Sequence, residues 1–182
     1  MKKATLIVLV VLAVFPAAFA RAEAPVTLLI SGGNENSSIS VSLSPDGREY
    51  VILSTAPLEV GGNLCTHPEE NLNELFCKAP SIAGFEVNAG GGSDFITFSS
   101  DIPAPVTIRG GPGGDRLTGG SASDKIIGGP DHDFLVGRRG DDWMLGGPGP
   151  DKLVGGSGDD VLRGGPDKDQ LVGGPGQNEL VP

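Results

Sequence analysis

The stretch that decides the fold runs from Gly110 to Val181 and divides into nonapeptides that follow one another without an insertion. The copies read GGPGGDRLT (110–118), GGSASDKII (119–127), GGPDHDFLV (128–136), GRRGDDWML (137–145), GGPGPDKLV (146–154), GGSGDDVLR (155–163), GGPDKDQLV (164–172) and GGPGQNELV (173–181). Repetition at a fixed short period predicts a solenoid, in which each unit stacks on its neighbours and cannot bury its apolar face alone.

Two positions of the nonapeptide keep their chemistry. Position six is aspartate in seven copies, namely Asp115, Asp124, Asp133, Asp142, Asp151, Asp160 and Asp169, and it is Asn178 in the last copy. Position eight is apolar in every copy: Leu117, Ile126, Leu135, Met144, Leu153, Leu162, Leu171 and Leu180. In a strand over positions seven to nine, alternation points position eight inward and its two neighbours outward. Glycines at positions one, two and four permit the positive φ of a tight turn.

This pattern resembles GGxGxDxUx, the calcium-binding nonapeptide of the repeats-in-toxin (RTX) family, in which U is a large apolar residue. The match covers about two fifths of the chain. The resemblance implies an all-β fold, a parallel β-roll or β-solenoid, that binds several Ca²⁺ ions between the turns of copies n and n+2.

If two copies make one coil, copies two apart stack about 4.8 Å from each other and the position-six side chains form two columns. One column holds Asp115, Asp133, Asp151 and Asp169, and the other holds Asp124, Asp142, Asp160 and Asn178. Ionised carboxylates at this spacing repel by about 3 kcal/mol per pair at an effective dielectric near 20. A hard cation that binds oxygen ligands turns this repulsion between carboxylates into a net attraction. We therefore predict that these aspartates bind calcium, and that the site that includes Asn178 is the weakest.

Three further aspartates join the predicted ligand set. Asp94 stands at position six of a weaker copy, AGGGSDFIT, over residues 89–97. Asp141 and Asp159 stand at position five, beside position-six aspartates of the second column. Arg138 and Arg139 replace glycine and the following residue in one copy, which weakens the prediction of a calcium site there; Asp141 offsets these cations.

Position four departs from glycine in three copies. Asp131 and Asp167 tolerate positive φ better than most residues do, whereas Ala122 predicts backbone strain. Position seven places Phe134 and Trp143 on the outside of opposite sheets, where they could form a contact surface or be isolated exposed aromatics.

The amino-terminal part is predicted to be a short β-rich cap. Expected strands cover 25–30, 38–44, 49–54, 84–88, 95–98 and 106–109, with a turn at 45–47 and a short helical turn at 69–76. Residues 32–40 and 101–109 also keep part of the repeat pattern. We therefore interpret the cap as a degenerate, calcium-poor extension of the coil; a separate small β-domain is the alternative.

The first 22 residues have the features of an export signal. Lys2 and Lys3 precede an apolar run over 6–15, and cleavage after Ala20 or Ala22 fits the small-residue rule. The alternative, an uncleaved anchor helix, would be short for a membrane span. Because an exported chain meets an oxidising compartment, we expect Cys65 and Cys77 to form a disulfide.

Charge and motifs exclude several functions. The net charge is −10, and it becomes −13 when the three cations of residues 1–22 are removed. Such a chain disfavours nucleic acid and anionic membranes as partners. Since no hydrolase or phosphate-binding motif is present, we predict a protein that is not an enzyme.

The predicted organisation has four parts: a signal peptide (1–22), the cap with its Cys65–Cys77 loop (23–88), degenerate repeats (89–109) and the calcium-binding β-roll (110–182). The predicted function is a secreted, extracellular calcium-binding module with a structural or surface-interaction role. A self-assembling matrix or calcium-buffer protein is the alternative, and a hydrolase accessory fragment is less favoured. Expected partners are calcium ions, with self-association or an unidentified extracellular protein as further options.

We expect the repeats to fold only with calcium, because one buried side chain per copy offsets little of the entropy of ordering nine residues.

Overall fold

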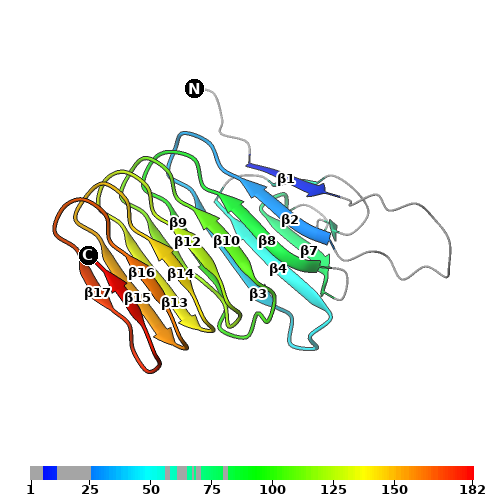
Figure 1. Cartoon of the computed structure of the whole chain (residues 1–182). Helices are drawn as coiled ribbons and strands as arrows, with labels where there is room; N and C mark the ends of the chain where they lie inside the picture. The colour runs from blue at the N-terminus through cyan, green and yellow to red at the C-terminus, as the bar shows by residue number, and fades with distance from the viewer. Residues whose placement is uncertain are drawn as a thin grey trace, which may run out of the picture.

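The computed structural model describes residues 6–11, 26–55, 58–60, 65–66, 68, 71–79 and 82–182, and these form two nine-stranded sheets (Figure 1). The first sheet contains, in spatial order, β18 (Glu179–Val181), β16 (Val161–Arg163), β14 (Trp143–Leu145), β12 (Lys125–Ile127), β10 (Val106–Arg109), β8 (Ile82–Asn88), β2 (Val26–Ser31), β1 (Leu6–Val11) and β5 (Leu58–Val60). The second contains β17 (Gln170–Val172), β15 (Lys152–Ser157), β13 (Phe134–Arg139), β11 (Arg116–Thr118), β9 (Phe95–Phe98), β3 (Ser38–Leu43), β4 (Glu49–Ser54), β7 (Glu74–Lys78) and β6 (Cys65–Thr66).

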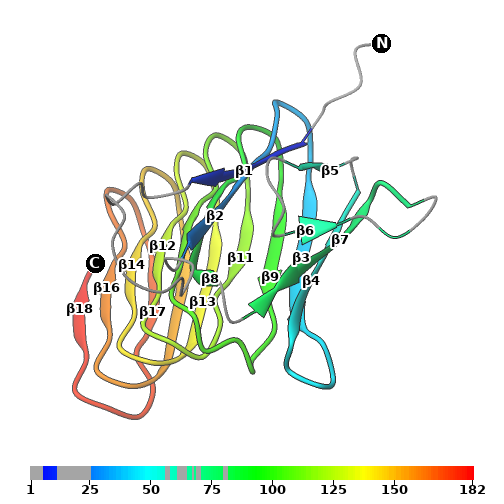
Figure 2. The same ribbon diagram turned by 90° about the vertical axis from the view of Figure 1, so that its right-hand side faces the viewer.

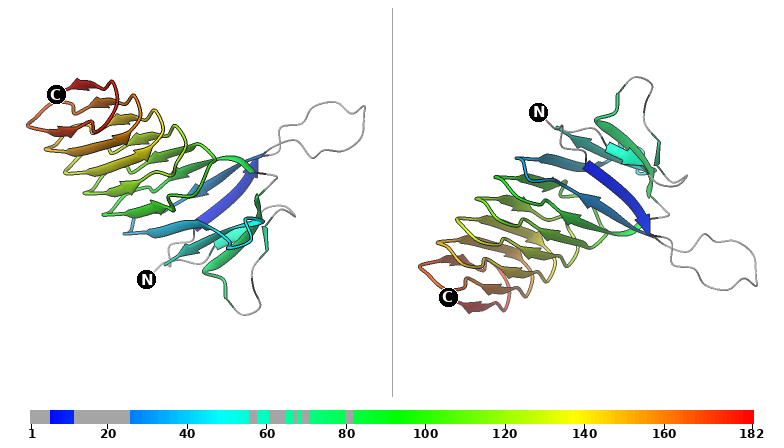
Figure 3. Two further views of the ribbon diagram at one scale, coloured as in Figure 1. Left: turned by 90° about the horizontal axis from the view of Figure 1, so that it is seen from below. Right: turned by 90° about the horizontal axis from the view of Figure 1, so that it is seen from above.

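The chain alternates between the two sheets through the repeats, so each coil holds one strand of each. Strands of copies two apart pair in parallel: Leu117 lies opposite Leu135, and Ile126 lies opposite Met144. Figure 3 shows the coils stacked one behind another along the roll. The predicted parallel β-roll, with two nonapeptides per coil, is therefore confirmed.

The core consists of two apolar columns, one behind each sheet. Position-eight side chains from Leu117 to Leu162 have no exposed surface, whereas Leu171 is half-buried and Leu180 is 44% exposed. Near the cap the columns widen into an aromatic cluster, where the Phe85 ring meets Tyr50 and Phe98 edge to face at centroid distances of 4.9 and 5.2 Å. The largest fully buried side chains therefore lie in the cap and the first coils.

The cap continues the coil, as the degenerate-repeat interpretation predicts. β2 pairs in parallel with β8, and β3 pairs in parallel with β9, with Ile39 opposite Ile96. β4, β7 and β6 then extend the second sheet with antiparallel pairs at the end away from the C-terminus (Figure 2). The predicted helical turn at 69–76 is wrong in the part described, because β7 begins at Glu74 and pairs with β4 over its whole length.

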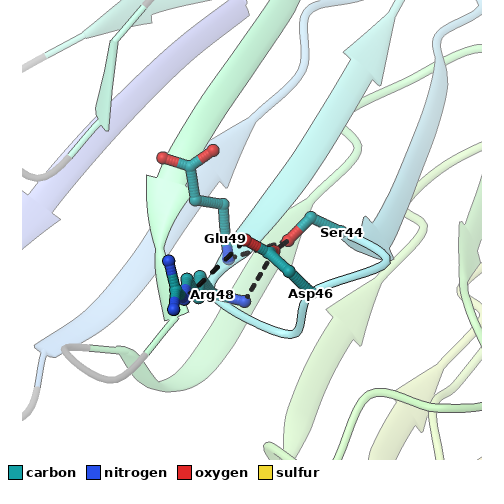
Figure 4. Close-up of polar contacts among 4 residues, drawn as sticks. All are labelled: Ser44, Asp46, Arg48 and Glu49. Carbon is teal, nitrogen blue, oxygen red and sulfur yellow. Dashed lines mark hydrogen bonds and ion pairs between the residues drawn. The ribbon is translucent and has the colours of Figure 1, made fainter.

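A polar turn joins β3 to β4 (Figure 4). Ser44 Oγ donates to Asp46 Oδ1 at 2.7 Å, and the same carboxylate accepts the Arg48 N–H at 3.2 Å. The Glu49 N–H closes the turn on Ser44 Oγ at 3.0 Å. These local bonds to the ionised carboxylate lower the pKa of Asp46 and fix the hairpin predicted at 45–47.

The predicted disulfide is present, and it joins directly opposed residues of β6 and β7, Cys65 and Cys77. β1 lies between β2, with which it pairs antiparallel, and the edge strand β5, with which it pairs in parallel. The predicted cleavage positions, Ala20 and Ala22, lie outside the described residues. The described part of the chain contains no helix that is both long and apolar enough to span a membrane.

Candidate metal centre

The position-six carboxylates are withdrawn from solvent, although each stands in a turn. Their exposed fractions are at most 3% for Asp94, Asp115, Asp124, Asp133, Asp142, Asp151 and Asp160, and Asp169 is half-buried. Each turn lies between a strand of one sheet and a strand of the other, so it carries its carboxylate inward at the edge of the roll. Carboxylates are almost never fully buried without a partner.

One oxygen of each carboxylate has a partner in the coil before it. The Asp115 N–H donates to Asp133 Oδ1 at 2.8 Å, and the Asp133 N–H donates to Asp151 Oδ1 at 2.8 Å. The same bond recurs along both columns, up to Asp160 N–H and Asn178 Oδ1 at 2.8 Å. These hydrogen bonds connect the turns of successive coils and hold every carboxylate in the same orientation.

The second oxygen is without a hydrogen-bond partner in all but one of these turns. The buried unpartnered atoms are Oδ2 of Asp94, Asp115, Asp133, Asp142, Asp151, Asp160 and Asp169. A buried acceptor that lacks a donor costs about 1–3 kcal/mol, and more when it is charged. Seven equivalent Oδ2 atoms without a donor in one small protein indicate that a group other than the protein satisfies them.

The glycine at position one makes room for this oxygen. A Cβ atom on Gly128 would lie 2.2 Å from Asp133 Oδ2 and 2.8 Å from the carbonyl oxygen of Gly146 in the next coil. The equivalent point at Gly110 lies 2.1 Å from Asp115 Oδ2 and 2.8 Å from the Gly128 carbonyl oxygen. The same pair of neighbours, a position-six Oδ2 and the position-one carbonyl oxygen of the following turn, lies beside the position-one glycines from Gly110 to Gly155.

Asn178 has a neutral amide where the other copies have a carboxylate. Its Nδ2 replaces Oδ2 against Gly173 and donates to the carbonyl oxygen of Gly174 at 3.0 Å. Gly174 is position two of the same copy, so an aspartate in this place would put an acceptor, in place of the amide donor, near a position-two carbonyl oxygen. Two acceptors that face each other require a proton or a cation between them.

The carboxylates respond to burial as this arrangement predicts. Burial raises the pKa of Asp133 and Asp142 to about 7, with neighbouring carboxylates adding to the effect. Burial also raises the pKa of Asp115 and Asp124 to about 6. Without a cation, these four carboxylates thus take up protons at a higher pH than exposed aspartates do.

The donor set fits calcium better than magnesium or zinc. Within the described residues, no three His, Cys, Asp or Glu side chains converge as a metal cluster. The oxygens available at each turn are one carboxylate and several backbone carbonyls. Calcium accepts six to eight such oxygens in flexible geometry, whereas magnesium requires a strict octahedron and zinc favours nitrogen or sulfur.

The predicted ligands fall into three groups. Asp94 joins the first column: its Oδ1 accepts the Ser37 N–H at 2.6 Å, and its Oδ2 is unpartnered. Asp124 differs, because its Oδ2 accepts the Gly120 N–H at 2.7 Å. Asp141 and Asp159 are exposed and form an outer ladder, in which the Asp159 N–H donates to Asp141 Oδ1 at 2.9 Å. The structure therefore does not bring these two into the column of unpartnered oxygens, and their role as ligands stays a prediction.

The backbone conformation at position four agrees with the prediction in two of the copies that lack glycine and differs from it in the third. Asp131 and Asp167 adopt φ values of 87° and 102°, so aspartate does tolerate the turn. The predicted strain at Ala122 is wrong, because neither Ala122 nor Gly120 has positive φ and the turn takes another shape. Sequence reasoning also missed the packing role of the position-one glycine, although the invariance of that glycine in all eight copies carried the signal.

Comparison with known proteins agrees with this geometry. Residues 109–144 and 145–180 each match the family model described as the RTX calcium-binding nonapeptide repeat (4 copies). The comparison with curated proteins finds no match. The comparison with solved structures likewise finds none.

Proposed function

We propose that this chain is a secreted module whose β-roll is stabilised by several calcium ions, because residues 109–180 match the model of the RTX calcium-binding nonapeptide repeat. The observation that carries the proposal is the set of seven buried, unpartnered Oδ2 atoms. The role is structural or surface interaction rather than catalysis.

The residues that would hold calcium follow from the repeat. In each interval, Oδ2 of a position-six aspartate supplies the charged ligand, and the position-one carbonyl of the next coil supplies a neutral one. At Asp133 these groups are Asp133 Oδ2 and Gly146 O, which approach the same point beside Gly128. A bound calcium ion supplies positive charge where the metal-free site needs a proton.

Export is the remaining part of the proposal. The cations and apolar run of residues 1–22 support a signal peptide, and the Cys65–Cys77 disulfide suits an oxidising compartment. Mass spectrometry of protein recovered from the medium would test this. A chain that begins after Ala20 or Ala22 is expected; retention of residue 1 in exported protein would contradict it.

Calorimetric titration of the purified, metal-free chain with calcium, repeated with magnesium, tests the metal. We expect several calcium ions per chain and a much weaker magnesium response. Absence of calcium binding at millimolar concentration would mean that the aspartates serve only the turns.

Self-assembly is a second candidate, favoured by apolar residues on the last two strands. Val172, Leu180 and Val181 are 50%, 44% and 41% exposed. Light scattering with and without calcium separates the candidates: growth in mass with calcium supports assembly, and a constant monomer mass rules it out.

A further inference from the structure

Arg138 has a backbone conformation that its side chain disfavours. It occupies position two, which is glycine in the other seven copies, and it adopts φ = 92°. Residues with a Cβ atom rarely adopt this region, and those that do often mark a functional constraint. The neighbouring Arg139 has no such conformation and is exposed.

The Arg138 side chain reaches back across two coils. Its Nη1 donates to the carbonyl oxygen of Gly119 at 2.9 Å and also to the carbonyl oxygen of Phe98. These two residues are equivalent positions of successive coils, because Thr118 lies opposite Thr97 in the β11–β9 pair and each of the two follows directly. The guanidinium therefore joins stacked position-one carbonyls, the same backbone atoms that lie beside Oδ2 elsewhere.

In the turn that Arg138 contacts, the second carboxylate oxygen of the position-six aspartate has a hydrogen-bond donor. Among the buried position-six aspartates of the described chain, Asp124 alone has a donor for Oδ2, the Gly120 N–H at 2.7 Å. The loop of the coil before it packs on this turn, since Ser121 Oγ donates to the Ile102 carbonyl at 2.8 Å. Burial raises the pKa of Asp124, and the charge of Arg138 opposes that rise.

We propose that Arg138 is a tethered cation that replaces calcium at the amino-terminal end of the second turn column. The inference rests on the proposed function, because it presumes that the other intervals take calcium. The turns around Phe98 and Gly119 then close without metal. Phe98 is also part of the aromatic cluster of the cap, so the second turn column begins on a calcium-independent base, on which its later coils order as calcium binds.

Arg138→Gln tests the proposal, with Arg139→Gln as the matched control. Glutamine removes the charge at either position, and at position 138 it keeps a side chain on the positive-φ backbone. We expect Arg138→Gln to lower the urea midpoint of the metal-free chain and to bind about one more calcium ion per chain than wild type. Arg139→Gln should match wild type in both measurements.

Equal metal-free midpoints for the two variants, or an unchanged calcium count in Arg138→Gln, would overturn the inference. If Arg138→Gln fails to fold, Arg138→Gly replaces it, because glycine suits φ = 92°. A wild-type chain that binds no calcium would instead overturn the proposed function, so the two failures are distinguishable.

Discussion

At the scale of the residue, the position-six carboxylate has two oxygens with different tasks. Oδ1 accepts the N–H of the preceding turn and is satisfied by the fold itself. Oδ2 has no donor in the protein at seven of these aspartates, Asp124 being the exception. The first oxygen therefore builds the roll, and the second makes the roll depend on a cation or a proton.

Asp133→Asn should separate these tasks. The amide keeps the Oδ1 contact and can donate as Asn178 does, so the metal-free chain should gain about 1–3 kcal/mol of unfolding free energy. The calcium count should fall by about one, because the charged ligand is lost. Urea denaturation and calcium titration measure both, with exposed Asp101→Asn as the control. A metal-free chain destabilised by Asp133→Asn would contradict this account.

Gly128→Ala should disturb the same site by adding a methyl group beside Asp133 Oδ2. The added Cβ would lie 2.2 Å from Asp133 Oδ2 and 2.8 Å from a backbone oxygen, so the coil must shift. We expect a loss of about 1–3 kcal/mol of stability from this overpacking, with weaker calcium binding. Gly91→Ala is the control, because its Cβ would meet nothing closer than 3.7 Å. Equal thermal midpoints for the two variants would count against the site geometry.

The pH dependence of the metal-free chain should be opposite to that of a salt-bridged carboxylate. Burial raises the folded pKa of Asp133 and Asp142 to about 7, above the unfolded value near 3.9. The protonated form is thus favoured on folding, and its stabilisation is full below the unfolded pKa and lost as pH rises towards 7. Urea midpoints in metal-free buffer should fall from pH 5 to pH 8; midpoints that rise over this range would show that the columns are not desolvated.

At the scale of the element, each short strand contributes one inward side chain and two outward ones. On the outer face, Phe134 of β13 lies between Arg116 of β11 and Lys152 of β15, with the cationic groups 4.5 and 5.4 Å from the ring centroid. Trp143 meets Lys125 in the same way on the other sheet at 4.9 Å. The position-seven aromatics thus contact cations of neighbouring coils.

Phe134→Leu should therefore weaken the pairing of β13 without touching the metal sites. Loss of the two cation contacts should cost about 1 kcal/mol at this half-exposed position. The calcium count should not change. Thermal unfolding of the calcium-loaded chain measures the first effect and titration the second; a reduced calcium count would place Phe134 in the site rather than on the outer face.

The repeated elements were predictable from sequence, and the departures from the repeat were not. The strands at 95–98 and 106–109 follow from local patterns that stacking reinforces. β7 (ELFCK) was missed because the polar residues before it suggested a helical turn, whereas its strand structure comes from pairing with β4. Arg138 was recognised as an exception, but its reach to Phe98 depends on which coils stack.

At the scale of the whole molecule, the roll is packed unevenly. The cap end contains the aromatic cluster and the disulfide, whereas each later strand adds a single aliphatic side chain. Burial of a large aromatic side chain stabilises more than burial of one leucine. The two ends should therefore respond differently to loss of calcium.

Hydrogen exchange should reveal this difference. In chelator, amides of β2, β3, β8 and β9 should stay protected, while those of β13 to β18 exchange rapidly. With calcium, protection should extend through the repeats. Equal protection of both ends in chelator would contradict a roll whose carboxy-terminal coils depend on metal.

The most direct measurement is a crystal structure of the chain grown with calcium, with anomalous scattering used to locate the ions. We predict an ion between Asp133 Oδ2 and the Gly146 carbonyl, with equivalents along the first column and beside Asp142 and Asp160 of the second. No ion is expected beside Asp124, where Arg138 donates to the Gly119 carbonyl. Carboxylates bonded only to water or to other protein groups, with no ion in either column, would contradict it.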